Sequence, residues 1–168
     1  MGVTIHFEGQ LKSTADYDKV MMTAKTFAES NTMAFSFFET PNKLLQRVKD
    51  EEDWDYVGAT KGIIIQPHET CDPLILEFDA NNYIQEYCKT QFADIIIHSK
   101  VIGLLRQIED CFIDLQVTDE GAFWETENVE LLSAHFNDCF LEIEEAMKEN
   151  PKLNGPYRVE DDRIIDLM

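Results

Sequence analysis

The sequence predicts an α+β fold, with about three helices packed on one face of a mainly antiparallel sheet. The first observation is the order of the hydrophobic periodicities: strand, helix and strand, then a group of strands, then helix, strand and helix. The second is the turn sequence at residues 79–82, which lies between two apolar segments and is typical of antiparallel neighbours.

The N-terminal elements follow from spacing. Apolar and polar residues alternate over 3–7, which predicts a half-buried strand with His6 on its outer face. A capping box that begins at Ser13 precedes apolar residues at helical spacing, so we expect a helix over 14–29. The short aromatic segment 34–38 predicts a second strand.

Pro41 is expected to end this second strand. Residues 43–49 are compatible with two helical turns, and an acidic loop at 50–53 follows them. Trp54 and Tyr56 come directly after the loop. These aromatic side chains either pack under the loop or contact a partner.

Three further strands are predicted over 62–66, 74–78 and 83–88, as a hairpin or a three-stranded meander. The period then changes to that of a long helix over about 91–112. A short strand follows and ends in a turn at 119–121.

Thr126 is expected to cap the last helix, which ends at Asn150 and Pro151. The core positions predicted for this helix are Leu132, Phe136, Cys139, Phe140, Ile143 and Met147. Residues 1–150 are expected to form a single domain. Residues 151–168 are expected to form a tail that straps across the domain or engages another copy of the chain.

Charge is the strongest signal in the composition. The chain has 14 Lys and Arg residues against 33 Asp and Glu residues, a net charge of −19. Residues 1–50 are neutral, and residues 107–147 contain twelve acidic residues and no Lys or Arg. Such a field repels nucleic acid and anionic lipid, and it favours a basic protein partner. The alternative is that the acidic residues only keep the protein soluble.

Sequence motifs exclude several classes of enzyme. The chain has no phosphate-binding glycine loop, no dinucleotide-binding motif, no nucleophile elbow and no zinc-protease motif. No apolar segment is long enough to cross a membrane and no signal peptide is evident, so we expect a cytoplasmic protein. Its four cysteines have no C-x-x-C spacing, and we expect them to be reduced and mostly structural.

A scatter of polar residues near predicted strand ends provides the candidates for catalysis or metal binding. Imidazole, thiolate and carboxylate groups can bind a divalent metal that activates water, and a carboxylate can act as a general base. The catalytic candidates are His6, Lys89, His98, Asp119 and Glu120. The metal-ligand candidates are His68, Cys71, His98 and Asp119. The alternative for each is an ordinary turn, boundary or core role.

Three segments resemble a family of uncharacterised bacterial cytoplasmic proteins: residues 3–11 (VTIHFEGQL), residues 89–93 (KTQFA) with His98 and the Leu-Leu-Arg at 104–106, and residues 117–125 (VTDEGAFWE). The resemblance implies a bacterial, intracellular setting and carries no activity. It draws attention to His6, Lys89, His98, Asp119, Glu120 and Trp124.

We therefore predict a non-enzymatic acidic module that binds a basic surface of another protein. Its most specific form is an immunity or inhibitor protein that covers the basic site of a nuclease toxin. The residues expected to contact the partner are Asp50, Glu51, Glu52, Asp53, Trp54, Asp138, Glu142 and Glu145. No cofactor is predicted. The alternatives are a metal-dependent hydrolase or small-ligand enzyme that uses the candidates above, and a structural homo-oligomer.

Overall fold

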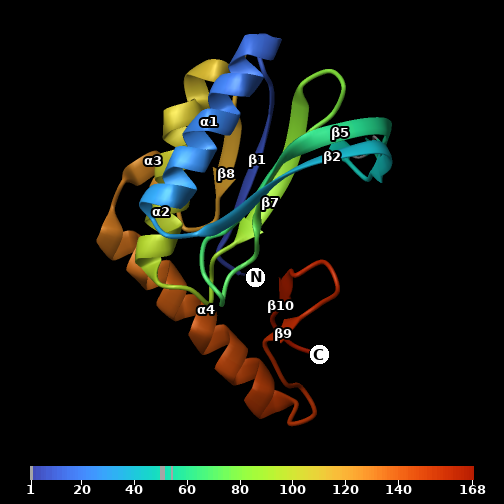
Figure 1. Ribbon diagram of the computed structural model, residues 1–168. Helices are drawn as coiled ribbons and strands as arrows, with labels where there is room; N and C mark the ends of the chain where they lie inside the picture. The colour runs from blue at the N-terminus through green and yellow to red at the C-terminus, as the bar shows by residue number, and fades with distance from the viewer. Residues whose placement is uncertain (1, 50–51, 54) are drawn as a thin grey trace.

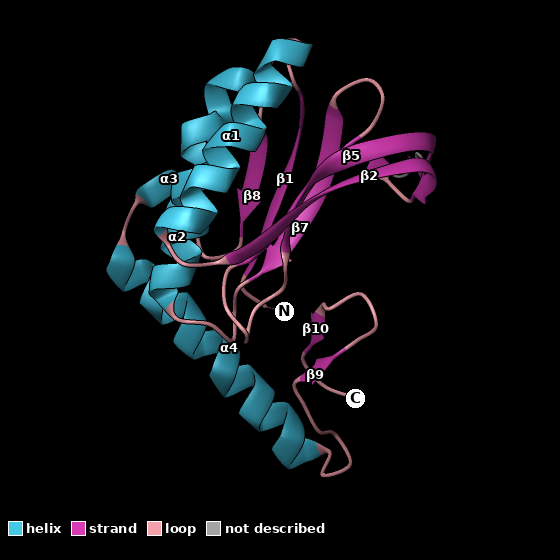
Figure 2. Cartoon of the chain, in the orientation of Figure 1, coloured by secondary structure: helices cyan, strands magenta, loops and turns pink. Residues whose placement is uncertain are grey.

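The computed structural model describes residues 2–49, 52–53 and 55–168. Its described part combines helices with antiparallel strands, which confirms the predicted α+β class. One three-stranded sheet has the order β7–β1–β8 and the other has the order β2–β5–β6. Figures 1 and 2 show α1, α2 and α3 on the same side of these strands.

The bounds of the elements are as follows. The first sheet contains β7 (Tyr83–Lys89), β1 (Thr4–Gln10) and β8 (Gln116–Asp119). The second contains β2 (Ala34–Leu45), β5 (Tyr56–Gln66) and β6 (Leu74–Phe78). Two short pairs are β3 (Val48–Lys49) with β4 (Glu52–Asp53), and β9 (Tyr157–Arg158) with β10 (Ile164–Ile165). The helices are α1 (Thr14–Ser30), α2 (Ile95–Ile108), α3 (Phe123–Thr126) and α4 (Val129–Glu149), with a 3-10 turn at Glu109–Cys111.

The main core lies between helices α1 and α2 and the strands. Alternation in β1 places Ile5 and Phe7 in this core, and His6 between them is exposed, as predicted. The predicted cap of α1 is also confirmed, because Ser13 Oγ accepts a hydrogen bond from the Asp16 amide at 3.2 Å. This helix is predictable from local sequence because its N-cap and its continuous apolar stripe both depend on residues that are close in the chain.

Residues 43–49 are not helical, contrary to the prediction. β2 continues through Pro41 to Leu45 because the β2–β5 ladder shifts register between Thr40 and Lys43. The irregularity accommodates a proline that cannot donate a ladder hydrogen bond, so Pro41 does not end the strand. The chain after β2 returns to the domain at Arg47, which is 3% exposed and forms an ion pair with Asp79 at 2.8 Å.

The predicted meander is only partly correct. β5 and β6 pair as antiparallel neighbours, but β7 pairs with β1 rather than extending the same sheet. The long helix is also shorter than predicted. It begins after Asp94, whose carboxylate accepts from the Ile96 amide at 3.0 Å, and the α-helix ends at Ile108.

The last helix begins later than predicted. Thr126 belongs to the short helix α3, and Asn128 caps α4 by accepting from the Leu131 amide at 3.0 Å. α4 buries Leu132, Phe136 and Cys139, which pack with Val3 in a second, smaller cluster. Phe140 is 39% exposed, and the half of α4 that follows it runs past the strands (Figure 1).

Residues 151–168, here called the C-terminal strap, return from α4 to the end of β7 (Figure 1). The strap contains the β9–β10 hairpin, and Ile164 is buried. The Ile164 amide donates to Asp72 Oδ1 at 2.7 Å, and Lys89 contacts Asp166 at 2.9 Å. The strap is thus held to the domain by polar contacts.

Candidate functional site

The five catalytic candidates do not meet in one pocket. His98 and Asp119 form a buried pair, whereas the side chain of His6 is 49% exposed on the outer face of β1. Lys89 forms an ion pair with Asp166 in the C-terminal strap. In the described residues, the candidates therefore lie in separate places: His98 with Asp119, His6 near Glu120, and Lys89 at the C-terminal strap.

The buried pair joins the start of α2 to the end of β8. His98 Nε2 lies 3.0 Å from Asp119 Oδ1, and His98 Nδ1 lies 2.7 Å from the hydroxyl of Thr90. Asp119 also accepts from the backbone amides of Gly121 at 2.8 Å and Trp124 at 2.9 Å. Burial opposes ionisation of Asp119, but His98 and these amides lower its pKa below the ordinary value.

This arrangement is structural in character. Both side chains of the pair are 0% exposed, and a Cβ added at Gly121 would lie 3.1 Å from His98 Nε2 and 2.6 Å from Leu132. The glycine allows the turn after β8 to approach the imidazole closely. The pair therefore connects α2, β8 and the turn into α3.

The metal candidates His68 and Cys71 also have separate partners. His68 Nδ1 lies 2.7 Å from the hydroxyl of Thr70, and the buried thiol of Cys71 donates to the carbonyl of Asp72 at 3.1 Å. Across residues 2–49, 52–53 and 55–168, no group of three or more His, Cys, Asp or Glu residues is arranged to hold a metal ion.

A concave site forms where the residues just before β1, the residue just after β8 and α4 meet. It has a volume of about 340 Å³, and we call it the acidic notch. Its lining residues are Gly2, Val3, Glu120, His135, Asp138, Cys139 and Glu142. Three carboxylates from two distant parts of the chain therefore line one cavity.

Local packing explains how the acidic notch forms. Glu120 Oε2 accepts from the Thr4 amide at 2.8 Å, and its other oxygen lies 3.8 Å from His6 Nε2. On α4, the lining residues His135, Asp138 and Glu142 follow helical spacing and share one face. Buried Cys139 packs against Val3 and so holds α4 in this position.

The acidic face of α4 continues beyond the notch. Asp138, Glu142 and Glu145 lie four and three residues apart and are exposed. Among the described residues, none of these carboxylates lies within ion-pair distance of a base. Asp50, Glu51 and Trp54, which were also predicted to contact a partner, lie outside the described residues. Of Glu52 and Asp53, only the backbone, in β4, is described.

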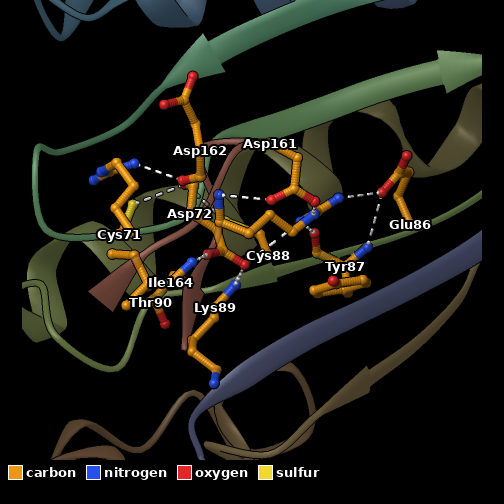
Figure 3. A network of polar contacts seen from close by, with 12 residues as sticks. Cys71, Asp72, Glu86, Tyr87, Cys88, Lys89, Thr90, Asp161, Asp162 and Ile164 are labelled. Carbon is orange, nitrogen blue, oxygen red and sulfur yellow. Dashed lines mark hydrogen bonds and ion pairs between the residues drawn. The ribbon is translucent and has the colours of Figure 1, made fainter. Parts of the chain in front are cut away.

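A dense polar network anchors the C-terminal strap (Figure 3). The guanidinium of Arg163 contacts Asp72 at 3.4 Å and Glu86 at 2.9 Å, and it lies 3.9 Å from the centroid of the Tyr87 ring. Asp72 is fully buried. Burial raises the pKa of Glu86 to about 7, although Arg163 favours the ionised form.

The comparisons with known proteins identify no relative: no family model, curated protein or solved structure matches the chain. In the described part of the chain, no helix has the length and apolar character needed to cross a membrane. Residues 3–11 and 117–125 lie side by side in the fold, since β1 pairs with β8. The contacts of His98 with Thr90 and Asp119 join α2 to the ends of β7 and β8.

Sequence reasoning missed two features of this region. Glu120 was predicted as a catalytic candidate, but it shares a cavity with Asp138 and Glu142, which were predicted to bind a partner. No feature of the sequence indicated that Arg163 anchors the C-terminal strap, because its partners are distant in sequence. The common face of His135, Asp138 and Glu142 was visible as helical spacing.

Proposed function

We propose that the protein is a non-enzymatic module that binds a basic surface of another protein through the acidic notch and the adjoining face of α4. The observation that carries the proposal is the convergence of Glu120, Asp138 and Glu142 around one concave site. In the described residues, Asp138 and Glu142 have no base within ion-pair distance, and a concave site with such carboxylates complements a lysine or arginine side chain of a partner.

The surroundings of the notch support the same proposal. Leu141 on α4 is 57% exposed and lies three residues after Asp138 and four before Glu145, so apolar surface adjoins the carboxylates. Apolar side chains beside charged ones are typical of interfaces, in which the apolar part supplies affinity and the charges supply orientation and encounter rate. The excess negative charge of the chain extends this attraction to a distance set by ionic strength.

The most specific form of the proposal is an immunity or inhibitor protein. Such a protein would cover the basic site of a nuclease toxin or of another protein that handles nucleic acid. A basic groove evolved to bind phosphate offers the charge pattern that the notch complements. The biological setting is inferred from this chemistry alone.

A capture experiment tests the proposal. The double variant Asp138→Asn/Glu142→Gln removes two charges from the notch and preserves side-chain size. The control Asp18→Asn/Glu29→Gln removes two charges from exposed positions on α1. At low salt, a basic protein should be enriched by the wild type and the control and lost from the notch variant. Equal capture by all three proteins would contradict the proposal.

A further inference from the structure

Two of the four cysteines lie together at the residue that anchors the C-terminal strap. Cys71 comes just before Asp72 and Cys88 belongs to β7, and both are free thiols that are 0% exposed. Cys71 Sγ lies 3.1 Å from the carbonyl oxygen of Asp72, and Cys88 Sγ lies 3.6 Å from the same oxygen. The two thiols are also within hydrogen-bond reach of each other. We call Cys71 and Cys88 the buried dithiol.

Backbone contacts hold the two segments of the buried dithiol side by side. The Asp72 amide donates to the carbonyl of Lys89 at 2.9 Å, and the Lys89 amide donates to Asp72 Oδ2 at 3.1 Å. Cys71 precedes one of these residues and Cys88 precedes the other. A disulfide needs Cα atoms about 4.4–6.8 Å apart, a range that includes the spacing of neighbouring strands. Both cysteines are therefore placed where a disulfide can form without unfolding of the domain.

The other two cysteines lie elsewhere in the fold. The carbonyl of Cys111 accepts from the Lys12 amide, beyond the end of β1, whereas Cys88 pairs with the start of that strand. Cys139 is on α4, in the smaller core cluster with Val3. The buried dithiol is therefore a specific pair, and Cys111 and Cys139 are internal controls for its reactivity.

The surroundings of the buried dithiol favour its protonated form. The hydrogen bond with Cys71 and burial raise the pKa of Cys88 well above its ordinary value, although the charge of Arg163 in the C-terminal strap opposes this shift. Because the thiolate is the nucleophile in disulfide exchange, such a thiol reacts slowly. Burial thus limits the rate of oxidation, whereas the proximity of the two sulfurs favours the disulfide at equilibrium.

We propose that Cys71 and Cys88 are a redox modification site, which forms a reversible disulfide by exchange with a small disulfide of the glutathione type. The thiolate of one cysteine attacks a glutathione sulfur, the glutathione S–S bond breaks, and the leaving thiolate takes up the proton that the cysteine lost. The second cysteine then attacks the protein sulfur of the mixed disulfide and releases the second glutathione. Two cysteine thiols and one glutathione disulfide become one protein disulfide and two glutathione thiols.

This site is separate from the acidic notch and goes beyond the proposed function. Figure 3 shows Cys71 and Cys88 close to Asp72, whose Oδ1 accepts from the Ile164 amide of the C-terminal strap at 2.7 Å. A disulfide between Cys71 and Cys88 would therefore tie the residue that anchors the strap to β7.

Equilibration of the protein with defined ratios of reduced to oxidised glutathione tests the proposal. Acid quenching, alkylation of the remaining thiols and peptide mass spectrometry identify the cysteines that are joined. The expected result is a Cys71–Cys88 disulfide in the wild type and in the control Cys111→Ser, and none in Cys88→Ser. The equilibrium constant for forming this disulfide should be at least tenfold larger in the native protein than in the urea-unfolded chain, because the fold holds the two sulfurs together.

The mapping on the wild type identifies the joined cysteines directly, so the test does not depend on the folding of Cys88→Ser. An equilibrium constant no larger than that of the unfolded chain would show that the fold does not favour this disulfide. A disulfide that involves Cys139, or one that joins two copies of the chain, would assign the reaction to other thiols and overturn the proposal. Mixed disulfides with glutathione and no protein disulfide would also contradict it.

Discussion

Replacing Asp119 with asparagine tests the structural role of the buried His98 pair. Asp119 accepts from the backbone amides of Gly121, Phe123 and Trp124, all within 2.9 Å, and its Oδ1 lies 3.0 Å from His98 Nε2. Oδ1 faces Gly121 and His98, whereas Oδ2 faces Phe123 and Trp124. An asparagine NH₂ group in place of Oδ1 leaves at least the Gly121 amide without an acceptor, and in place of Oδ2 it leaves two amides without one.

The magnitude follows from the loss of at least one acceptor. A buried donor without a partner costs about 1–3 kcal/mol, so Asp119→Asn should lower the free energy of unfolding by roughly 1–3 kcal/mol. For a domain of this size, each kcal/mol corresponds to a fall in Tm of about 2–4 °C. The pKa of Asp119 is lowered in the folded protein, so its stabilising contribution is present above its ordinary pKa and is lost as the pH falls through the folded value.

Urea denaturation at neutral pH measures the effect. The exposed replacement Glu149→Gln at the end of α4 is the control and should change stability by less than about 0.5 kcal/mol. If Asp119→Asn were as stable as this control, the pair would not hold the fold together, and a functional role for His98 and Asp119 would have to be reconsidered.

Two further predictions concern the C-terminal strap. Arg163→Met leaves Asp72 and Glu86 without their guanidinium partner, so amide hydrogen exchange at residues 157–165 should accelerate at least tenfold. The main core contains no strap residue and should keep its protection against exchange. An unchanged exchange pattern would show that other contacts hold the strap. The raised pKa of Glu86 means that folding takes up a proton between its ordinary pKa of 4.5 and about 7. Its contribution to stability is therefore complete below that window and lost as the pH rises through about 7, by roughly 1–3 kcal/mol. Because Glu86→Gln cannot titrate, the wild type should lose stability relative to this variant over that range, and parallel pH profiles would contradict the assignment.

Local sequence was sufficient where one segment determines its own structure. The alternation of β1 and the cap and apolar stripe of α1 each depend on residues close in the chain. The continuation of β2 beyond Pro41 was not predictable in this way, because the register irregularity that accommodates Pro41 depends on pairing with β5. Likewise, nothing near Tyr83–Lys89 indicates that this strand pairs with β1 rather than with β6.

The candidate sites show the same division. His98 and Asp119 were identified individually, but only the packing of α2 against β8 shows that they form a buried pair. The common face of Asp138 and Glu142 follows from helical spacing. The presence of Glu120 in the same cavity depends instead on the packing of Cys139 and its neighbours on α4 against Val3. Convergence of distant carboxylates is a tertiary property.

The most direct test of the central claim is the affinity of the captured basic partner for the notch variant. Isothermal titration at two salt concentrations would compare the wild type, Asp138→Asn/Glu142→Gln, and Asp18→Asn/Glu29→Gln. We predict that the notch variant binds at least tenfold more weakly and has a shallower salt dependence, while the α1 control retains most of the affinity. Equal affinities and salt slopes for the two double variants would contradict binding through the acidic notch.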